Sequence, residues 1–163
     1  MLSGLIVRQF QPRDLEVVVD IGNRAWQRIY DMFEETYGRD LFEILIPDRK
    51  AQKGEQVRAK CTSQPQDVLV CESGGTIVGF VTFSMDLKLK IGQITNNAAD
   101  PSCELKGIGQ SMYAAVLDIF RAAGMKYAKV TTGEDWAHAP ARRAYEMAGF
   151  DIPHSDVTYH MKL

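Results

Sequence analysis

Two glycines, Gly107 and Gly109, mark the point in the sequence where a binding site is most readily placed. They precede a helical pattern that runs to Ala123. Backbone amides at the start of such a helix, with the helix dipole behind them, form a site for phosphate groups. Two nucleotide fingerprints do not fit. Met112 stands where a dinucleotide-binding turn needs a third glycine, and Gln110 follows Gly109 where a Walker loop needs lysine. Tight packing at the turn is the alternative explanation of the glycines.

Other side chains with nucleophilic or metal-binding chemistry are scattered along the chain. Cys61, Cys71 and Cys103 contain no Cys-x-x-Cys pair, which argues against a disulfide framework or a zinc site. Histidines at positions 138, 154 and 160 leave a Cys–His nucleophile open, although reduced, mostly buried thiols are the simpler interpretation. We therefore expect free cysteines and no metal.

Length and composition limit the classes of protein to consider. The 163 residues suffice for one compact domain, with 45% hydrophobic and 25% charged residues. Nineteen Lys and Arg against 21 Asp and Glu leave a net charge of −2, which argues against a nucleic-acid binder. The apolar runs are too short to span a membrane, and the N-terminus lacks the pattern of a signal peptide. The sequence thus predicts a soluble, cytoplasmic protein.

The first part of the chain predicts a strand followed by helices. Leu5–Phe10 has the pattern of a strand closed by Pro12, and Asp14 is a candidate N-cap whose carboxylate would accept from first-turn amides. Apolar residues between Leu15 and Ile29 recur at spacings of three and four, which indicates one helical face. Further helices are expected over 31–46, with a break near Gly38, and within 48–66.

The second part predicts a sheet interleaved with helices. Strands are expected at Val68–Glu72, Thr76–Met85, Ile91–Ala99, Tyr127–Thr132 and, from its period-two alternation, Val157–Leu163. Helices are expected from the glycine turn to Ala123 and from Ala139 to Gly149. A strand–turn–helix–strand unit normally joins parallel neighbours. The chain should therefore be an α/β sandwich around a mixed central sheet.

Two segments carry a resemblance to a known family. Residues 96–113, with the core Glu104-Leu105-Lys106-Gly107-Ile108-Gly109, resemble the acetyl-CoA motif Gln/Arg-x-x-Gly-x-Gly/Ala of the GNAT superfamily of N-acetyltransferases. Residues 131–150 are similar to its second signature, a short helix ending in Tyr-Glu-x-x-Gly-Phe. The resemblance covers residues 68–163 and is weak over 1–67.

The resemblance implies a fold, a cofactor and a site. The fold would be a single α/β domain over 1–163, with helices on both faces of a mixed sheet and two parallel strands that part at the cofactor site. Residues 68–163 would bind acetyl-CoA, and the variable residues 1–67 would line the acceptor site. The implied cofactor-binding residues are Asn97, Ala98, Ala99, Leu105, Lys106, Gly107, Ile108, Gly109, Gln110, His138 and Tyr145.

Acid and base roles follow from the same resemblance. Tyr145 matches the family's frequent general acid, and a phenol of pKa about 10 can donate to a thiolate of pKa about 8.5. Its apolar helix face also suits a core position. Glu134 is a general-base candidate, with Asp135, Glu34, Glu35 and a water relay as alternatives.

Four further residues have two interpretations each. Arg142 and Arg143 are candidate phosphate contacts or solvated charges. Trp26 and Tyr30 are candidate walls of the acceptor site or core residues.

The predicted activity is transfer of the acetyl group of acetyl-CoA to a primary amine by direct attack, with no metal. The acceptor would be a small molecule or a peptide, and a homodimer remains open. The alternative is a weakly active or inactive CoA-binding sensor. It is favoured by Glu104 where the family has Gln or Arg, and by Leu105 where glycine is common.

Overall fold

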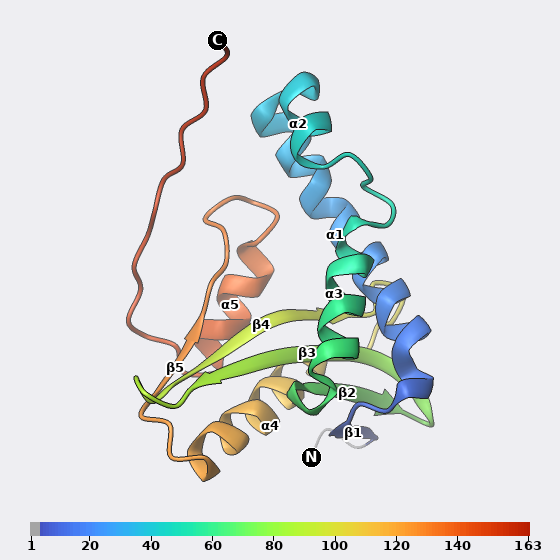
Figure 1. Ribbon diagram of the computed structural model, residues 1–163. Helices are drawn as coiled ribbons and strands as arrows, with labels where there is room; N and C mark the ends of the chain where they lie inside the picture. The colour runs from blue at the N-terminus through green and yellow to red at the C-terminus, as the bar shows by residue number, and fades with distance from the viewer. Residues whose placement is uncertain (1–3) are drawn as a thin grey trace.

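The computed structural model describes residues 4–163, and its elements follow the sequence prediction as far as residue 147 (Figure 1). Strands form at β1 (Leu5–Gln9), β2 (Val68–Ser73), β3 (Thr76–Asp86), β4 (Ile91–Ala99) and β5 (Tyr127–Val130). Helices form at α1 (Leu15–Tyr37), α2 (Arg39–Leu45), α3 (Gln52–Ser63), α4 (Ile108–Ala122) and α5 (Ala139–Met147). Short 3-10 turns lie at Pro12–Asp14 and Pro65–Asp67. Among the helices of residues 4–163, none is long and apolar enough to cross a membrane.

The sheet is mixed, as predicted, and its strands lie in the order β1-β2-β3-β4-β5. The pairs β1–β2, β2–β3 and β3–β4 are antiparallel. Helix α4 then crosses over and brings β5 parallel to β4. This crossover places the glycine turn at the end of the sheet where β4 finishes.

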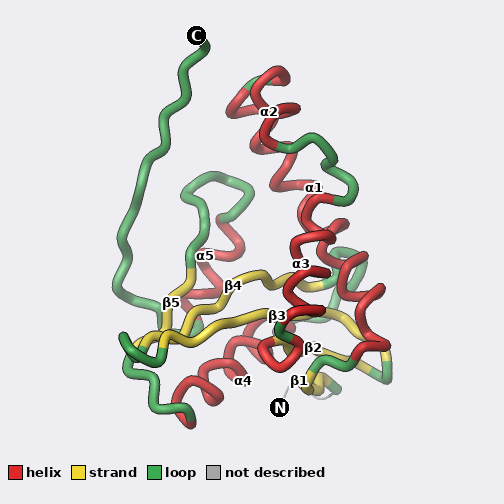
Figure 2. The backbone as a smooth tube through the Cα atoms, viewed as in Figure 1, coloured by secondary structure: helices red, strands yellow, loops and turns green. Residues whose placement is uncertain are grey.

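Helices pack on both faces of the sheet, and the amphipathic patterns explain which face each one takes. The apolar stripe of α4, with Met112 and Val116, packs with Tyr145 of α5 on one face. Val18 and Ile21 of α1 pack with Val57 of α3 on the other. Figure 2 shows α4 and the α1–α3 layer on opposite sides of the strands.

Helix α4 lies very close to β4. A Cβ atom at Gly92 would overlap the ring of Phe120, so only glycine permits this distance. The close packing holds the strand and the helix that flank the candidate site.

Asp14 stands at the start of α1, but its predicted hydrogen bonds are wrong. Its carboxylate accepts from the backbone N–H of Gln11 at 2.8 Å and from Arg8 at 2.7 and 3.0 Å, not from first-turn amides. The 3-10 turn before α1 directs the side chain back toward β1. Arg8 also donates to Glu72 at 2.8 Å, so the cluster ties β1 to β2 and to the start of α1. The hydrogen bonds from Arg8 hold the pKa of Asp14 below its ordinary value.

The predicted strand Val157–Leu163 is wrong. Residues 151–163, which we call the C-terminal arm, form no strand and are exposed throughout. The arm runs away from the sheet toward α2 (Figure 1). Period-two alternation marks a segment with two distinct faces, but a strand also needs a neighbour for its backbone groups. The arm passes no strand in the described chain.

Candidate active site

The two parallel strands part at the point where the sequence places the cofactor. Pairing between them runs from Ile91↔Tyr127 to Ile94↔Val130. Strand β4 then continues to Ala99 beside β3, with a register shift opposite Val81–Phe83. In an antiparallel pair only half of the backbone groups point to the partner strand. In residues 95–99 the other half face the side that β5 has left, within the described chain. This gap offers free backbone donors and acceptors to a ligand.

Asn97 and Tyr145 meet at the edge of this gap. The Asn97 side-chain amide donates to the Tyr145 hydroxyl oxygen over 2.9 Å. The Asn97 amide oxygen accepts from the Tyr113 hydroxyl over 2.8 Å. The residues come from β4, α5 and α4, and the two tyrosine rings pack at 5.1 Å. The sequence analysis identified Asn97 and Tyr145 but gave no role to Tyr113, which ends the segment 96–113 and lies outside its core 104–109.

The direction of these hydrogen bonds favours proton donation by Tyr145. Burial raises the pKa of Tyr113, so this phenol stays protonated and fixes the orientation of the Asn97 amide. Asn97 thereby occupies the acceptor capacity of the Tyr145 oxygen and leaves its proton free. Tyr145 is only 7% exposed, and the Tyr113 hydroxyl is the other polar group recorded beside its oxygen. A buried phenol held in this way can give its proton to a group bound in the gap.

The glycine turn opens α4 as predicted, with the helix beginning at Ile108. Gly107 has a φ of 86° at the N-cap, a left-handed conformation that favours glycine. The first-turn amides of α4 have no acceptors inside the helix and remain available to an anion. Gln110 donates to the Ala144 carbonyl at 2.8 Å, which ties α4 to α5. The preceding residues Glu104, Leu105 and Lys106 are exposed.

The loop between β5 and α5 is organised by its own polar contacts. His138 donates its backbone N–H to Asp135 at 3.0 Å, and its ring nitrogen Nδ1 lies 2.7 Å from the same carboxylate. Burial opposes ionisation of Asp135, but the His138 contacts outweigh it and lower the pKa of Asp135. Arg142 donates to the carbonyls of Gly133 and Asp135 at 2.6 and 2.7 Å. Arg142 therefore braces the loop in this structure.

The remaining candidates of this region lie outside the loop's polar network. Arg143 is exposed. Glu134 is also exposed and accepts from Ser155 at 2.7 Å.

A buried lysine lies on the opposite face of β4 from α4. Lys53 of α3 is 8% exposed; its ammonium group donates to Asn96 at 3.0 Å and lies 4.0 Å from the centre of the Trp26 ring. No ion pair to Lys53 is recorded among the described residues, and burial lowers its pKa to about 8. The sequence analysis missed it, although Lys53 shares a helical face with Val57 and Cys61 at spacings of four and eight. This group borders the gap from the side of the variable segment.

Three of the other candidates in residues 1–67 take part in packing or ion pairing within the fold. Tyr30 is a core residue packed on Phe42, and Trp26 is half-buried beneath Lys53. Glu34 forms an ion pair with Arg49, and Glu35 is exposed.

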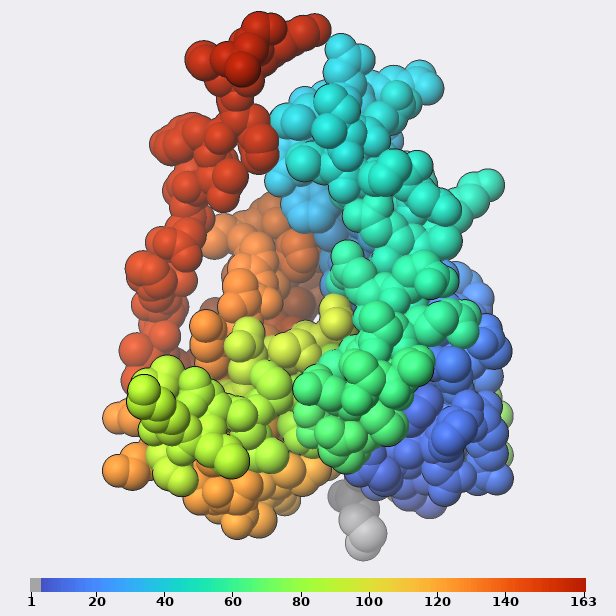
Figure 3. Space-filling model, in the orientation of Figure 1, coloured from blue at the N-terminus to red at the C-terminus, as the bar shows by residue number. Residues whose placement is uncertain are grey.

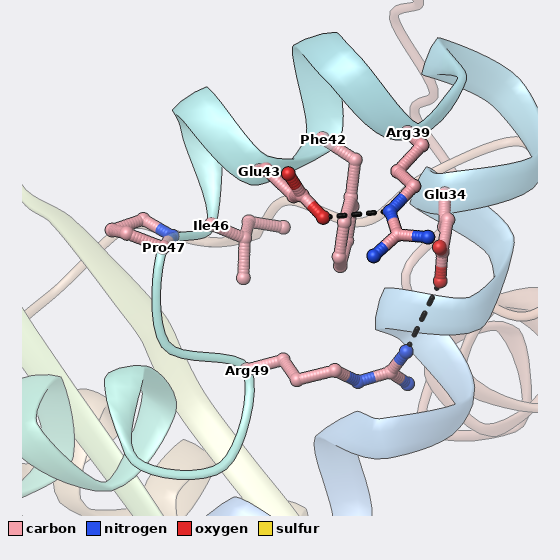
Figure 4. Close-up of a pocket in the computed structure, with 7 residues that line it drawn as sticks. All are labelled: Glu34, Arg39, Phe42, Glu43, Ile46, Pro47 and Arg49. Atoms are coloured by element: carbon pink, nitrogen blue, oxygen red, sulfur yellow. Dashed lines mark hydrogen bonds and ion pairs between the residues drawn. The ribbon is translucent and has the colours of Figure 1, made fainter.

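A hollow beside α2 collects charged residues away from the sheet (Figure 4). Its charges neutralise one another: Arg39 pairs with Glu43 at 2.8 Å, and Arg49 pairs with Glu34 at 3.2 Å. Figure 1 shows α2 at the end of α1 that is remote from the sheet. The hollow is therefore distinct from the gap.

The cysteines are free thiols, as predicted. Cys61 and Cys71 are buried, and Cys103 is half-buried. Burial raises the pKa of Cys61 to about 11, which keeps the thiol protonated.

The fold and site define a class of α/β domain in which two parallel strands separate beside the N-terminus of a helix. The model of the Acetyltransferase (GNAT) family matches residues 26–150, so the chain belongs to that family.

Individual relatives are distant. Mycothiol acetyltransferase of Segniliparus rotundus is 24% identical over 162 residues. The match covers 96% of this chain and 56% of that protein, so the chain spans little more than half of its relative's length.

The fold is shared with solved structures, and two of them serve as examples. One is the PaiA N-acetyltransferase of Thermoplasma acidophilum in complex with coenzyme A, with a TM-score of 0.68, 16% identity and coverage of 93% and 92% of the two chains. The other is Ard1 of Thermoplasma volcanium, with a TM-score of 0.65, 20% identity and coverage of 93% and 85%.

Proposed function

We propose that this chain transfers the acetyl group of acetyl-CoA to a primary amine by direct attack. The observation that carries the proposal is the Tyr145 phenol, which Asn97 holds beside the unpaired stretch of β4. Family membership and the coenzyme A complex of the Thermoplasma acidophilum relative support the same hypothesis. We further propose that residues 68–163 bind acetyl-CoA and that residues 1–67 line the acceptor site.

The donors of the gap fit the chemistry of acetyl-CoA. Alternate backbone groups along Asn97–Ala99 face the side that β5 leaves, which suits the amides of a pantetheine arm. The amides of residues 105–110 would hold the pyrophosphate at the start of α4. The His138 ring would contact the arm through its Nε2 atom, since Nδ1 faces Asp135. When bound, acetyl-CoA supplies an activated acyl thioester.

The residues around the gap account for the movement of protons. The neutral amine forms the new C–N bond as the C–S bond breaks, and Tyr145 Oη gives its proton to the departing sulfur. The proton that the nitrogen loses on becoming an amide restores the phenol. The acceptor amine has to lose a proton before attack, because an amine of pKa about 10.4 is almost fully protonated at neutral pH. Glu134 is the proposed base, with a water relay as the alternative. Binding both reactants together supplies much of the rate.

A thiol-release assay tests this function against a CoA-binding module without turnover. The protein is mixed with acetyl-CoA and pooled amines, and free thiol is measured over time. Amine-dependent release identifies an acetyltransferase. Tight binding of acetyl-CoA with no thiol release from any pool identifies a binding module. This is the alternative indicated by Glu104, which stands where the family has Gln or Arg.

Acetyl-CoA binding is expected to stabilise the fold. At a hundred times its dissociation constant, a ligand of the native state adds about 2.7 kcal/mol to the free energy of unfolding. Gly109→Asp should abolish the shift in melting temperature, because a carboxylate would meet the phosphates. A Cβ at Gly109 lies 3.4 Å from the Tyr113 ring, an ordinary contact, so the variant should fold.

Gly74→Asp is the matched control for this experiment. It adds the same carboxylate in the β2–β3 turn, where a Cβ meets nothing within 4 Å, and should keep the shift. The φ of 56° at Gly74 is left-handed, a conformation that Asp adopts more readily than most residues, so the variant should lose some stability but still fold. A wild-type melting temperature unchanged by millimolar acetyl-CoA would contradict binding at this turn.

Glu104→Gln is expected to lower the dissociation constant for CoA several-fold at low salt. Glu104 is exposed just before the turn, and its carboxylate would repel the phosphates of the ligand. Salt screens this repulsion, so the gain should shrink as ionic strength rises. Titration calorimetry of both forms at two salt concentrations measures the effect, with Glu35→Gln on α1 as the control. Equal affinities at low salt would mean that the carboxylate points away from the ligand.

A further inference from the structure

The ammonium group of Lys53 is a buried positive charge whose recorded partners are neutral. It donates to the Asn96 side-chain oxygen at 3.0 Å and lies 4.0 Å from the centre of the Trp26 ring. In the part of the chain that the structure describes, no carboxylate is recorded as offsetting the effect of burial on its pKa. Lys53 is also the second residue of α3, an end of a helix where the dipole favours negative charge. A cation in these surroundings gains strongly from an anion that binds beside it.

Two arginines of the α1–α3 region show the contrast with Lys53. Arg49 pairs with Glu34 at 3.2 Å, and Arg24 pairs with Asp100 at 2.7 Å. The charges of both arginines are therefore balanced within the fold. The charge of Lys53 is the one in this region that remains to attract a ligand.

Asn96 supplies a second donor next to Lys53. An ammonium group only donates, so the Asn96 amide has to turn its oxygen toward Lys53 and its nitrogen Nδ2 away from it. No acceptor for this nitrogen is recorded within residues 4–163, and Asn96 is half-buried. Lys53 Nζ and Asn96 Nδ2 are therefore neighbouring donors, an arrangement that suits the two oxygens of a carboxylate.

These two donors lie on the side of the gap that faces away from α4. Asn96 comes two residues after Ile94, the last residue of β4 that pairs with β5. Helix α3 packs on the opposite face of the sheet from α4, whose first turn is the proposed phosphate site. Thr95 is exposed, and Figure 3 shows yellow atoms of β4 between α3 in green and the β5–α5 segment in orange. An anion at Lys53 would therefore come from the acceptor, because the phosphates of the cofactor lie on the other face.

We propose that Lys53 and Asn96 bind a carboxylate of the acceptor, so that the preferred acceptor is a small molecule with both an amine and a carboxylate, as in an amino acid. This inference rests on the proposed acetyl transfer. A carboxylate carries one negative charge, which matches the single ammonium group, whereas a phosphate monoester carries about two at neutral pH. With the carboxylate at Lys53, the amine would point into the gap toward a thioester bound beside Asn97. An acceptor with a second ammonium group would instead meet Lys53 as a like charge.

Matched pairs of amines test this preference in the thiol-release assay. The pairs are glycine with methylamine, β-alanine with ethylamine, and γ-aminobutyrate with propylamine, and the members of each pair differ by one carboxylate. We expect kcat/KM for at least one amino acid to exceed that of its partner roughly tenfold or more, since hydrogen bonds to charged groups are strong enough for this factor. Amino acids that react no faster than their partners would overturn the inference and leave acetyl transfer in place.

Lys53→Met separates recognition of the carboxylate from the effect that a carboxylate has on the basicity of a nearby amine. The variant should lower the ratio of kcat/KM within a pair by roughly tenfold, chiefly through KM. The matched control Lys50→Met removes an equal charge from an exposed position and should keep the wild-type ratio. An unchanged ratio in Lys53→Met would overturn the inference. An equal loss of kcat for all amines would also overturn it, because it would make Lys53 a base or a structural residue.

Calorimetry decides the inference separately from the activity. The three amino acids are titrated into the protein saturated with CoA, so that binding is measured without turnover. Wild type and Lys50→Met should bind at least one of them, and Lys53→Met should bind it roughly tenfold more weakly. This result supports the carboxylate site even if no amine releases thiol, an outcome that would contradict the proposed function alone. The absence of binding to wild type, or equal affinities for wild type and Lys53→Met, would overturn the site.

Discussion

Replacing Tyr145 by Phe is expected to reduce kcat roughly 100-fold or more while leaving the affinity for acetyl-CoA nearly unchanged. The variant keeps the ring that packs against Tyr113 and Phe150 and loses only the hydroxyl group. That hydroxyl has its proton free because Asn97 donates to its oxygen. Without it, the departing sulfur has to leave as a thiolate or take its proton from water. Steady-state rates and calorimetric affinities on the same preparations measure the two quantities.

Two control variants separate proton donation by the Tyr145 hydroxyl from the packing of the tyrosine rings. Tyr113→Phe removes the phenol that orients Asn97 but leaves the Tyr145 hydroxyl in place, so it should cause a smaller loss of kcat. Tyr37→Phe, at the far end of α1, should have no effect on kcat. An unchanged kcat in Tyr145→Phe, with chemistry shown to limit the rate, would remove Tyr145 from the mechanism.

Lys53→Met is expected to change how stability depends on pH. The lysine pKa falls from 10.5 in the unfolded chain to about 8 in the fold, because burial penalises the charged ammonium. Between these values the unfolded state binds a proton that the folded state does not, so wild-type stability rises with pH over this window. The rise relative to Lys53→Met should reach about 3 kcal/mol, at 1.36 kcal/mol for each unit of pKa.

Urea unfolding of both proteins at pH 7, 8, 9 and 10 measures this difference directly. Methionine fills a similar volume without a charge, so the variant should be at least as stable as the wild type at pH 7. Lys50→Met, three residues earlier and exposed, should reproduce the wild-type pH dependence. Parallel curves for wild type and Lys53→Met would mean that water reaches the ammonium group in the folded state.

Regular apolar spacing correctly predicts the helices and strands that have a packing partner in the fold. Helix α4 and strand β4 follow from regular apolar spacing, and their ends agree with the structure within a few residues. The C-terminal arm has an equally regular pattern and forms no strand, because alternation does not say whether a neighbouring strand lies within reach. Asp14 shows a similar limit, since its residue type suits a cap but the turn before it directs the carboxylate to Arg8.

The sequence predicts the site residues that belong to a local motif. It does not predict those that distant elements bring together in the fold. The glycine turn and Tyr145 were found from residues close together in the sequence. Tyr113 joins the site by packing on the Tyr145 ring and by donating to Asn97, 16 residues away, and these contacts exist only once α4 packs on the sheet. Lys53 was overlooked because lysine is ordinarily a surface residue, although its position on the Val57 face of α3 indicated burial.

The separation of β4 from β5 after Ile94 bears on how such a site withstands mutation. The groups that face the gap are peptide N–H and C=O groups, which every residue except proline provides in full. Substitutions along residues 95–99 can therefore alter the lining of the gap while preserving its hydrogen-bonding capacity. Only changes that close the strands together or insert proline would abolish it. Hydrogen bonding by the main chain is thus insulated from sequence drift, even where the side chains along the strand change.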